Sequence, residues 1–332
     1  MDFLNYVWPG LAVGLAGIWV AIGQGILAKK AMEVMGKSPK MATFYLTVTI
    51  LGIALVESAV IYGLVVAFQL LGAEGLPLYS SIGAGLAIGL AGLGAGIWEG
   101  QLIAGALSAM NRNPQIKGKI MTFMVLFVAL VEVTAIYGLI IAFKIIGEGA
   151  ALDPMYALGA GLAIGLAWVW VAIWRGYMSE KSLEVMGKNP KMISFFLTVS
   201  ILWVALIESA AIYALIVSFS ILSFDGAGAA AVGAGFAIGL AGLGAGLGEG
   251  LLIKGAIEAI NKSPESKGKI MSFMVLFVAL IEVVAIYGMI IAFKVLAPVE
   301  VNVETVEVSE NTNTAIVETV ESNEATTDTV AE

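Results

Sequence analysis

The stretch that decides the fold runs from Ile120 to Lys144, IMTFMVLFVALVEVTAIYGLIIAFK, and returns almost unchanged from Ile270 to Lys294 as IMSFMVLFVALIEVVAIYGMIIAFK. Each copy is long enough to cross about 30 Å of hydrocarbon as a helix. Each also carries one acidic residue in its interior, Glu132 or Glu282. Because the two copies are 150 positions apart, the two halves of the chain are duplicates of each other.

Each half divides again into two similar parts. A proline and a glutamate recur about every 75 residues, at Pro39, Pro114, Pro190 and Pro264 and at Glu57, Glu132, Glu208 and Glu282. The sequence therefore predicts four tandem helical hairpins, over residues 1–75, 76–150, 151–226 and 227–297. The remaining segment, 298–332, is acidic, polar and repetitive, so we expect a disordered tail, with an edge strand on a partner as the minority alternative.

Composition places these hairpins in a membrane. Apolar residues make up 60% of the 332 residues, and charged residues are held to 13%. Long apolar runs predict eight transmembrane helices, near 8–28, 43–72, 80–109, 120–146, 157–178, 193–223, 229–260 and 270–297. We therefore expect an all-α membrane protein.

The basic residues predict its orientation. Of the 17 lysines and arginines, 14 lie in or beside the connections near 29–40, 112–119, 181–191 and 254–269. By the positive-inside rule these connections are cytoplasmic and both termini are extracytoplasmic, as in a multi-pass protein of the cell membrane.

The first helix of each hairpin is rich in small residues, as in GAGLAIGLAGLGAGIWEG from Gly83 to Gly100. Such helices approach one another closely in lipid, whereas the second helices carry bulky Val, Ile, Leu and Phe. This contrast predicts an inner ring of thin helices within an outer ring of thick ones. A phosphate-binding loop is disfavoured, because no strand precedes the glycines and no Gly-Lys-Ser/Thr follows them. The chain therefore has no nucleotide site and is not expected to be an enzyme by itself.

Four glutamates at mid-membrane depth are the sharpest functional indication. A carboxylate there costs about 2.5–3.5 kcal/mol or more and usually marks an ion path. The alternative, helix-to-helix hydrogen bonding by protonated glutamates, explains one such residue better than four at equal spacing.

Hydroxyl groups accompany these glutamates. A tyrosine stands five residues after each one, at Tyr62, Tyr137, Tyr213 and Tyr287, and a serine follows two of them, at Ser58 and Ser209. Ser58 and Tyr62 share a helix face about 100° from Glu57. This arrangement predicts a site between neighbouring hairpins, in which one supplies the acid and the next the hydroxyls. The first helices add a polar residue in register with the glutamates, at Gln24, Glu99, Arg175 and Glu249.

Residues 8–297 resemble the rotor-ring proteolipids, which form the c-ring of rotary F-type and V-type ATPases. In the sodium-binding members of that family, a first-helix glutamine, a glutamate-serine pair and a tyrosine five after the glutamate hold the ion. Gln24, Glu57, Ser58 and Tyr62 match that pattern. A carboxylate in every hairpin resembles the F-type pattern, whereas fused hairpins are commoner among V-type and archaeal relatives.

The resemblance implies a homo-oligomeric ring in lipid that carries Na⁺ or H⁺, with no cofactor and no nucleic-acid partner. It also implies two protein partners: a stator subunit, whose arginine faces the ring, and a central stalk. The stalk would contact the cytoplasmic loops at Pro39, at Arg112-Asn113-Pro114, at Pro190 and at Pro264, of which Arg112-Asn113-Pro114 is the strongest match. Sodium is preferred as the cargo because hard oxygen ligands surround the acids.

Two kinds of hairpin depart from the sodium pattern. Hairpins two and four carry two acids each, Glu99 with Glu132 and Glu249 with Glu282, and one acid of each pair should hold a proton. They lack the serine, so we expect Ser58 or Ser209 of a flanking hairpin to complete their sites.

Hairpin three carries Arg175 in place of the glutamine, among Trp168, Trp170 and Trp174. We expect Arg175 to neutralise Glu208 as an ion pair, so that this hairpin transports no ion and the ring favours ATP-driven pumping. In the alternative, Arg175 extends toward the cytoplasm and leaves Glu208 free.

Two other function classes remain open. A secondary ion transporter with internal repeats also places acids at the midplane, but it usually has inverted repeats and broken helices, which this sequence lacks. A passive proteolipid pore without ATPase partners makes the same demands on the sequence apart from the stalk-docking loops.

Overall fold

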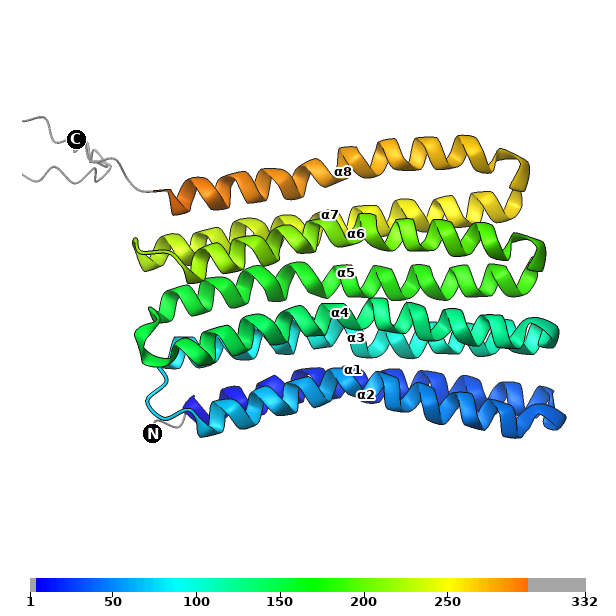
Figure 1. Ribbon diagram of the computed structural model, residues 1–332, viewed down its shortest axis with the longest axis horizontal. Helices are drawn as coiled ribbons and strands as arrows, with labels where there is room; N and C mark the ends of the chain where they lie inside the picture. The colour runs from blue at the N-terminus through cyan, green and yellow to red at the C-terminus, as the bar shows by residue number, and fades with distance from the viewer. Residues whose placement is uncertain (1–3, 298–332) are drawn as a thin grey trace, which may run out of the picture. The chain divides into compact units, whose positions relative to one another are not determined.

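The architecture comes from a computed structural model that describes residues 4–297; the segment predicted to be a disordered tail lies outside this described part. Within it, every regular element is an α-helix or a single 3-10 turn (Figure 1). The α-helices are α1 (Leu4–Lys37), α2 (Ala42–Gly72), α3 (Leu78–Arg112), α4 (Lys117–Glu148), α5 (Pro154–Lys188), α6 (Ile193–Leu222), α7 (Gly228–Lys262) and α8 (Lys267–Leu296). All eight are long and apolar enough to cross a membrane, as predicted.

The helices pair in chain order into the hairpins α1–α2, α3–α4, α5–α6 and α7–α8. The two helices of each hairpin are joined by a single 3-10 turn that begins with a proline. These turns are η1 (Pro39–Met41), η2 (Pro114–Ile116), η4 (Pro190–Met192) and η5 (Pro264–Ser266). Proline suits the first position of such a turn because its φ is fixed near the helical value and it has no N–H to satisfy. The hairpins are connected to one another at the opposite end (Figure 1), and the expected limits at residues 75, 150 and 226 fall in these connections.

The first helices are longer than the apolar runs suggested. Helix α1 continues to Lys37 rather than ending near residue 28, and α5 continues to Lys188 rather than 178. Charged side chains end an apolar run but do not end a helix. A helix of 35 residues, such as α3, is about 52 Å long at 1.5 Å per residue, which exceeds the roughly 30 Å of hydrocarbon. Its ends therefore extend beyond the apolar region.

The helices form two layers within the described part. The first helices contact one another in sequence, α1 with α3, α3 with α5 and α5 with α7. Each second helix contacts its own first helix, and α2, α4 and α6 also contact the first helix of the following hairpin. The predicted separation into a thin and a thick layer therefore holds within one chain.

Glycines set the spacing of the thin layer. A Cβ atom added at Gly23 would lie 2.1 Å from the carbonyl oxygen of Gly96, and one at Gly100 would lie 2.2 Å from that of Gly23. The same relation joins α3 to α5, where a Cβ at Gly83 would lie 2.1 Å from the oxygen of Ala157. Backbone touches backbone at these points, so these glycine positions have no room for a side chain.

Candidate ion-binding sites

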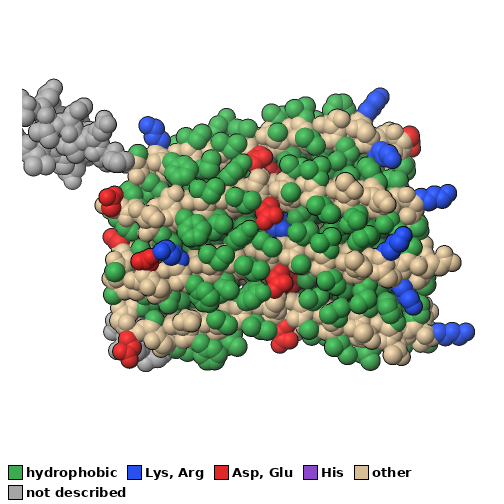
Figure 2. Space-filling model, viewed as in Figure 1, with side chains coloured by type: hydrophobic (Ala, Val, Ile, Leu, Met, Phe, Trp, Pro, Cys, Tyr) green, Lys and Arg blue, Asp and Glu red, His purple; other side chains and the backbone are tan. Residues whose placement is uncertain are grey.

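The second-helix glutamates lie near the midpoints of their helices. Figure 2 shows acidic side chains in a row across the middle of the helices, and most of the basic side chains in this view lie at the end where the hairpin turns are. The four positions share a level but differ in their surroundings.

Hairpin two brings three of the expected residues together. The hydroxyl of Tyr62 on α2 donates a hydrogen bond of 2.6 Å to Glu132 Oε1 on α4. The second acid, Glu99 on α3, is fully buried, and neither of its carboxylate oxygens has a hydrogen-bond partner among the described residues. The phenol therefore comes from the preceding hairpin, and both acids come from the hairpin itself.

Hairpin four repeats this arrangement. Tyr213 on α6 donates a hydrogen bond of 2.6 Å to Glu282 Oε1 on α8. Glu249 on α7 is fully buried, and both of its oxygens lack a hydrogen-bond partner in the part of the chain that is described. Two independent copies of the repeat thus build the same constellation across a hairpin boundary.

Hairpin three differs at every one of these contacts. Arg175 Nη2 on α5 lies 3.6 Å from Glu208 Oε2 on α6, and the Arg175 side chain is fully buried. The tyrosine of the preceding hairpin, Tyr137, packs its ring against Trp168 with 5.0 Å between ring centroids. Between residues 4 and 297, Tyr137 makes no hydrogen bond to Glu208. The Glu208 carboxylate is therefore paired with a guanidinium from the first helix of its own hairpin, whereas Glu132 and Glu282 accept a hydrogen bond from a phenol of the preceding hairpin.

The ends of the described array leave two of the expected residues without a neighbour. Glu57 on α2 is exposed, and the described part holds no hairpin before it to supply a tyrosine. Tyr287 on α8 is 62% exposed, and the same part holds no hairpin after it to supply a glutamate. Gln24 on α1 is partly buried.

The two serines hydrogen-bond within their own helices. Ser58 Oγ donates to the Leu55 carbonyl oxygen at 2.8 Å, and Ser209 Oγ donates to that of Leu206 at 2.7 Å. Among the described contacts neither serine reaches Glu132 or Glu282. A hydroxyl used as a donor in this way keeps its oxygen lone pairs, which can still face a cation.

The structure also contains polar features that sequence reasoning missed. Near the hairpin turns, Ser38 Oγ donates to Asn111 Oδ1 at 2.8 Å, and Asn189 Nδ2 donates to Asn261 Oδ1 at 3.1 Å, so neighbouring hairpins are linked beside the loop prolines. No short motif announces such contacts, because their partners are more than 70 residues apart.

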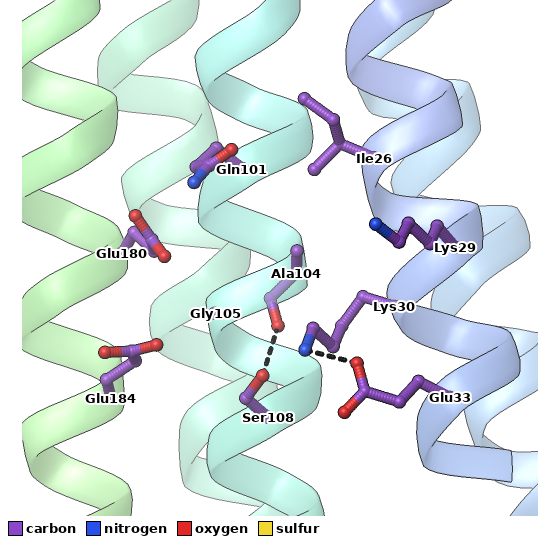
Figure 3. A pocket seen from close by; sticks show the side chains of 10 residues that line it. All are labelled: Ile26, Lys29, Lys30, Glu33, Gln101, Ala104, Gly105, Ser108, Glu180 and Glu184. Carbon is purple, nitrogen blue, oxygen red and sulfur yellow. Dashed lines mark hydrogen bonds and ion pairs between the residues drawn. The ribbon is translucent and has the colours of Figure 1, made fainter. Parts of the chain in front are cut away.

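A polar cavity of about 320 Å³ opens among α1, α3 and α5 (Figure 3). Lys30 and Glu33 line it from α1, with 2.6 Å between Lys30 Nζ and Glu33 Oε2, and Glu180 and Glu184 line it from α5. Helix α3 contributes Gly105 at this level, where a Cβ would lie 2.6 Å from Glu180 Cγ. The cavity lies nearer the hairpin turns than the row of glutamates and shares none of its residues.

Comparison of the sequence with known protein families identifies the same four-hairpin repeat. The sequence matches the family of the ATP synthase C subunit in four consecutive segments, residues 7–70, 82–145, 158–221 and 232–294. These segments cover most of the chain and place one match in each hairpin.

Individual relatives agree with this assignment. The chain is 34% identical over 225 residues to the K subunit of the A-type ATP synthase of Methanocaldococcus jannaschii, covering 66% of this chain and 96% of that protein. It is 50% identical over 68 residues to the ATP synthase c subunit of Protochlamydia amoebophila, covering 20% of this chain and 69% of that protein. A third relative, the ATP synthase c subunit of Thermotoga petrophila, is 47% identical over 75 residues, or 22% of this chain and 88% of that protein. The chain is a multi-pass membrane protein that belongs to the ATP synthase C subunit family, the membrane rotor components of ATP synthases, and carries four tandem copies of the family's hairpin.

Proposed function

We propose that copies of this chain close into a ring that turns in the membrane. In this ring the glutamates take up Na⁺ or H⁺ from one half-channel and release it through another. The hydrogen bonds from Tyr62 to Glu132 and from Tyr213 to Glu282 carry this proposal, because each joins two hairpins at the level of the buried acids. A carboxylate surrounded by residues of two neighbours suits a cation that must be held and then released.

The unpartnered ends of the array favour ring closure by further copies. A Cβ at Gly25 on α1 or Gly244 on α7 would meet nothing within 4 Å. At the repeat-related Gly100 and Gly94, a Cβ would lie within 2.6 Å of a neighbouring backbone oxygen. The glycine faces of α1 and α7 are thus shaped for the same close contact but have no helix against them in the described part. A second copy would supply it, and would bring Tyr287 of one copy to Glu57 of the next.

Sodium is the preferred cargo. Hairpin one offers the Gln24 amide oxygen, the Glu57 carboxylate and the Ser58 hydroxyl, which are the hard oxygen ligands that alkali cations favour. In hairpins two and four, a second carboxylate, Glu99 or Glu249, stands in place of the amide. These groups would bind the ion as cargo, and the buried position would keep water from competing for it.

The remaining partners follow from membership of the family and from the loops. A stator subunit with an arginine facing the ring would release each ion. A central stalk would contact the loops at Pro39, Arg112-Asn113-Pro114, Pro190 and Pro264. These loops carry the basic residues, which supports placing them on the cytoplasmic side of the cell membrane with both termini outside.

Carbodiimide labelling of the purified ring tests this function. A carboxylate-reactive carbodiimide should modify Glu132, and NaCl should slow the reaction far more than KCl at the same pH. Protection by neither salt would leave H⁺ as the cargo, whereas no labelling of any glutamate would contradict an ion-carrying role. Imaging down the ring axis must show a closed circle, and a soluble ATPase head should copurify.

A further inference from the structure

We infer that hairpin three is a permanently neutralised position, in which Arg175 holds Glu208 so that it takes up no transported cation. The inference rests on the proposed function of the other glutamates and assigns a different role to this one. The side chains around Glu208 carry the argument.

The first step is the position of Arg175. Its guanidinium lies 3.6 Å from the Glu208 carboxylate, and its side chain is 0% exposed. It therefore does not extend toward the end of the helix, where an arginine in a membrane would reach water. Among residues 4–297, the Glu208 carboxylate is the one acid within ion-pairing distance of it.

The second step is the electrostatic cost of adding a cation to this pair. Arginine stays charged in proteins, and a Na⁺ bound to Glu208 would be forced close to the guanidinium in a medium of low dielectric constant. Adding a proton to Glu208 instead would leave a buried arginine without its counter-charge, which is strongly unfavourable. Neither cargo can therefore replace Arg175 as the partner of this carboxylate.

The third step is the rearrangement of the residues that serve the site elsewhere. Tyr62 and Tyr213 each donate a hydrogen bond of 2.6 Å to the next glutamate, but Tyr137 packs against Trp168 instead. Trp168 is fully buried and stands where hairpin two has Gly92 in the repeat. On the other side, Trp174 covers α7, since a Cβ at Gly250 would lie 2.1 Å from Trp174 Cγ. One aromatic ring thus takes up Tyr137, which makes no hydrogen bond to Glu208, and another fills the space between α5 and α7.

The charge balance of the pair explains how such a hairpin remains compatible with rotation. A glutamate loaded with Na⁺ is neutral overall, and so is a glutamate paired with arginine. Hairpin three can therefore face lipid as a loaded hairpin does, without carrying anything. Each chain then moves ions at three of its four hairpins, which lowers the number of ions per turn relative to the number of hairpins.

Site-resolved labelling of the intact ring tests the inference. After brief exposure to the carbodiimide without Na⁺, proteolysis and mass spectrometry give the modified fraction at each glutamate. We expect modification at Glu57, Glu132 and Glu282 and at least tenfold less at Glu208. Equal modification of Glu208 and Glu132 in the wild-type ring would overturn the inference. No modification at any position would instead count against the proposed function.

Two matched variants identify Arg175 as the cause. Arg175→Gln gives hairpin three the same glutamine, glutamate and serine as hairpin one, so Glu208 should become reactive and Na⁺ should protect it. The reciprocal Gln24→Arg should suppress modification of Glu57 and leave Glu132 unchanged. An unreactive Glu208 in an assembled Arg175→Gln ring would contradict the assignment. If that variant fails to assemble, the wild-type comparison still decides.

Discussion

Tyr62 on α2 and Glu132 on α4 meet across a hairpin boundary through a hydrogen bond of 2.6 Å, although 70 residues separate them in the chain. The phenol therefore belongs to the hairpin that precedes the acid. Tyr213 and Glu282 repeat this arrangement. Each of these tyrosines thus supports the glutamate of the following hairpin rather than the glutamate of its own.

Removing this phenol should weaken the site of the following hairpin. Tyr62→Phe keeps the ring but loses a hydrogen bond to a charged group, worth about 1.5–3 kcal/mol, so Na⁺ affinity at Glu132 should fall about 10- to 100-fold. The measurement is the NaCl concentration that half-protects Glu132 from carbodiimide. Tyr137→Phe is the control, because Tyr137 makes no such bond to Glu208, and it should alter protection at no glutamate. Unchanged protection in Tyr62→Phe would show that the phenol does not support the site.

The variant Tyr287→Phe tests whether Tyr287 of one copy contacts Glu57 of the next copy in a closed ring. Tyr287 is 62% exposed in the single chain, so a solitary chain should not respond to its loss. In a ring the same change should weaken Na⁺ protection of Glu57 about as much as Tyr62→Phe weakens that of Glu132, by roughly 10- to 100-fold. Protection at Glu282 should stay at the wild-type level. A response at Glu282 rather than Glu57 would mean that Tyr287 acts within its own hairpin.

The glycine contacts predict a sharp difference between two Gly→Ala variants. Gly100→Ala places a Cβ 2.2 Å from the Gly23 carbonyl oxygen and should destabilise the ring by about 1–3 kcal/mol through overpacking. Gly118→Ala meets nothing within 4 Å and should be neutral or stabilising by up to about 1 kcal/mol, because alanine favours helices over glycine. The temperature at which the ring dissociates in detergent reports both effects. Equal temperatures for the two variants would rule out backbone contact at Gly100.

Glu99→Gln should convert the hairpin-two site into the hairpin-one type. Glu99 is fully buried without a hydrogen-bond partner in the described part, and hairpin one has Gln24 in the same place. We expect the variant ring to assemble. Carbodiimide should still modify its Glu132, and Na⁺ should still protect Glu132 from that modification. Glu132→Gln is the contrasting variant and should abolish Na⁺ binding at this hairpin. If Glu132 in the Glu99→Gln ring were neither modified by carbodiimide nor protected by Na⁺, Glu99 rather than Glu132 would be the acid that carries the ion.

Much of this fold is legible from the sequence because the membrane restricts the possibilities. A helix of apolar residues satisfies its own backbone in lipid, so hydropathy alone locates α1 to α8, and the repeat places their acids at one level. The ends of the helices were less predictable. The charged residues up to Lys37 in α1 and up to Lys188 in α5 lie beyond the apolar run but are still helical.

The sequence could not predict whether the tyrosine at each site comes from the preceding or from the following hairpin. The angle of about 100° between Glu57 and Ser58 or Tyr62 indicates a neighbour on each side, but it does not say which neighbour comes first. That choice depends on how successive hairpins rotate about one another, which is a property of three-dimensional packing. The position of Tyr137 was equally hidden, because it follows from the volume of Trp168 on another helix.

The covalent connections between hairpins, such as η3 (Gly149–Ala151) between α4 and α5, have a consequence for assemblies of this chain. Because each chain contributes four covalently joined hairpins, the number of hairpins in any closed ring of whole chains must be a multiple of four. In the proposed ring, the hairpin that carries Arg175 therefore recurs at every fourth position. The proportion of such hairpins is fixed by the sequence of one chain and does not depend on random mixing of separate subunits.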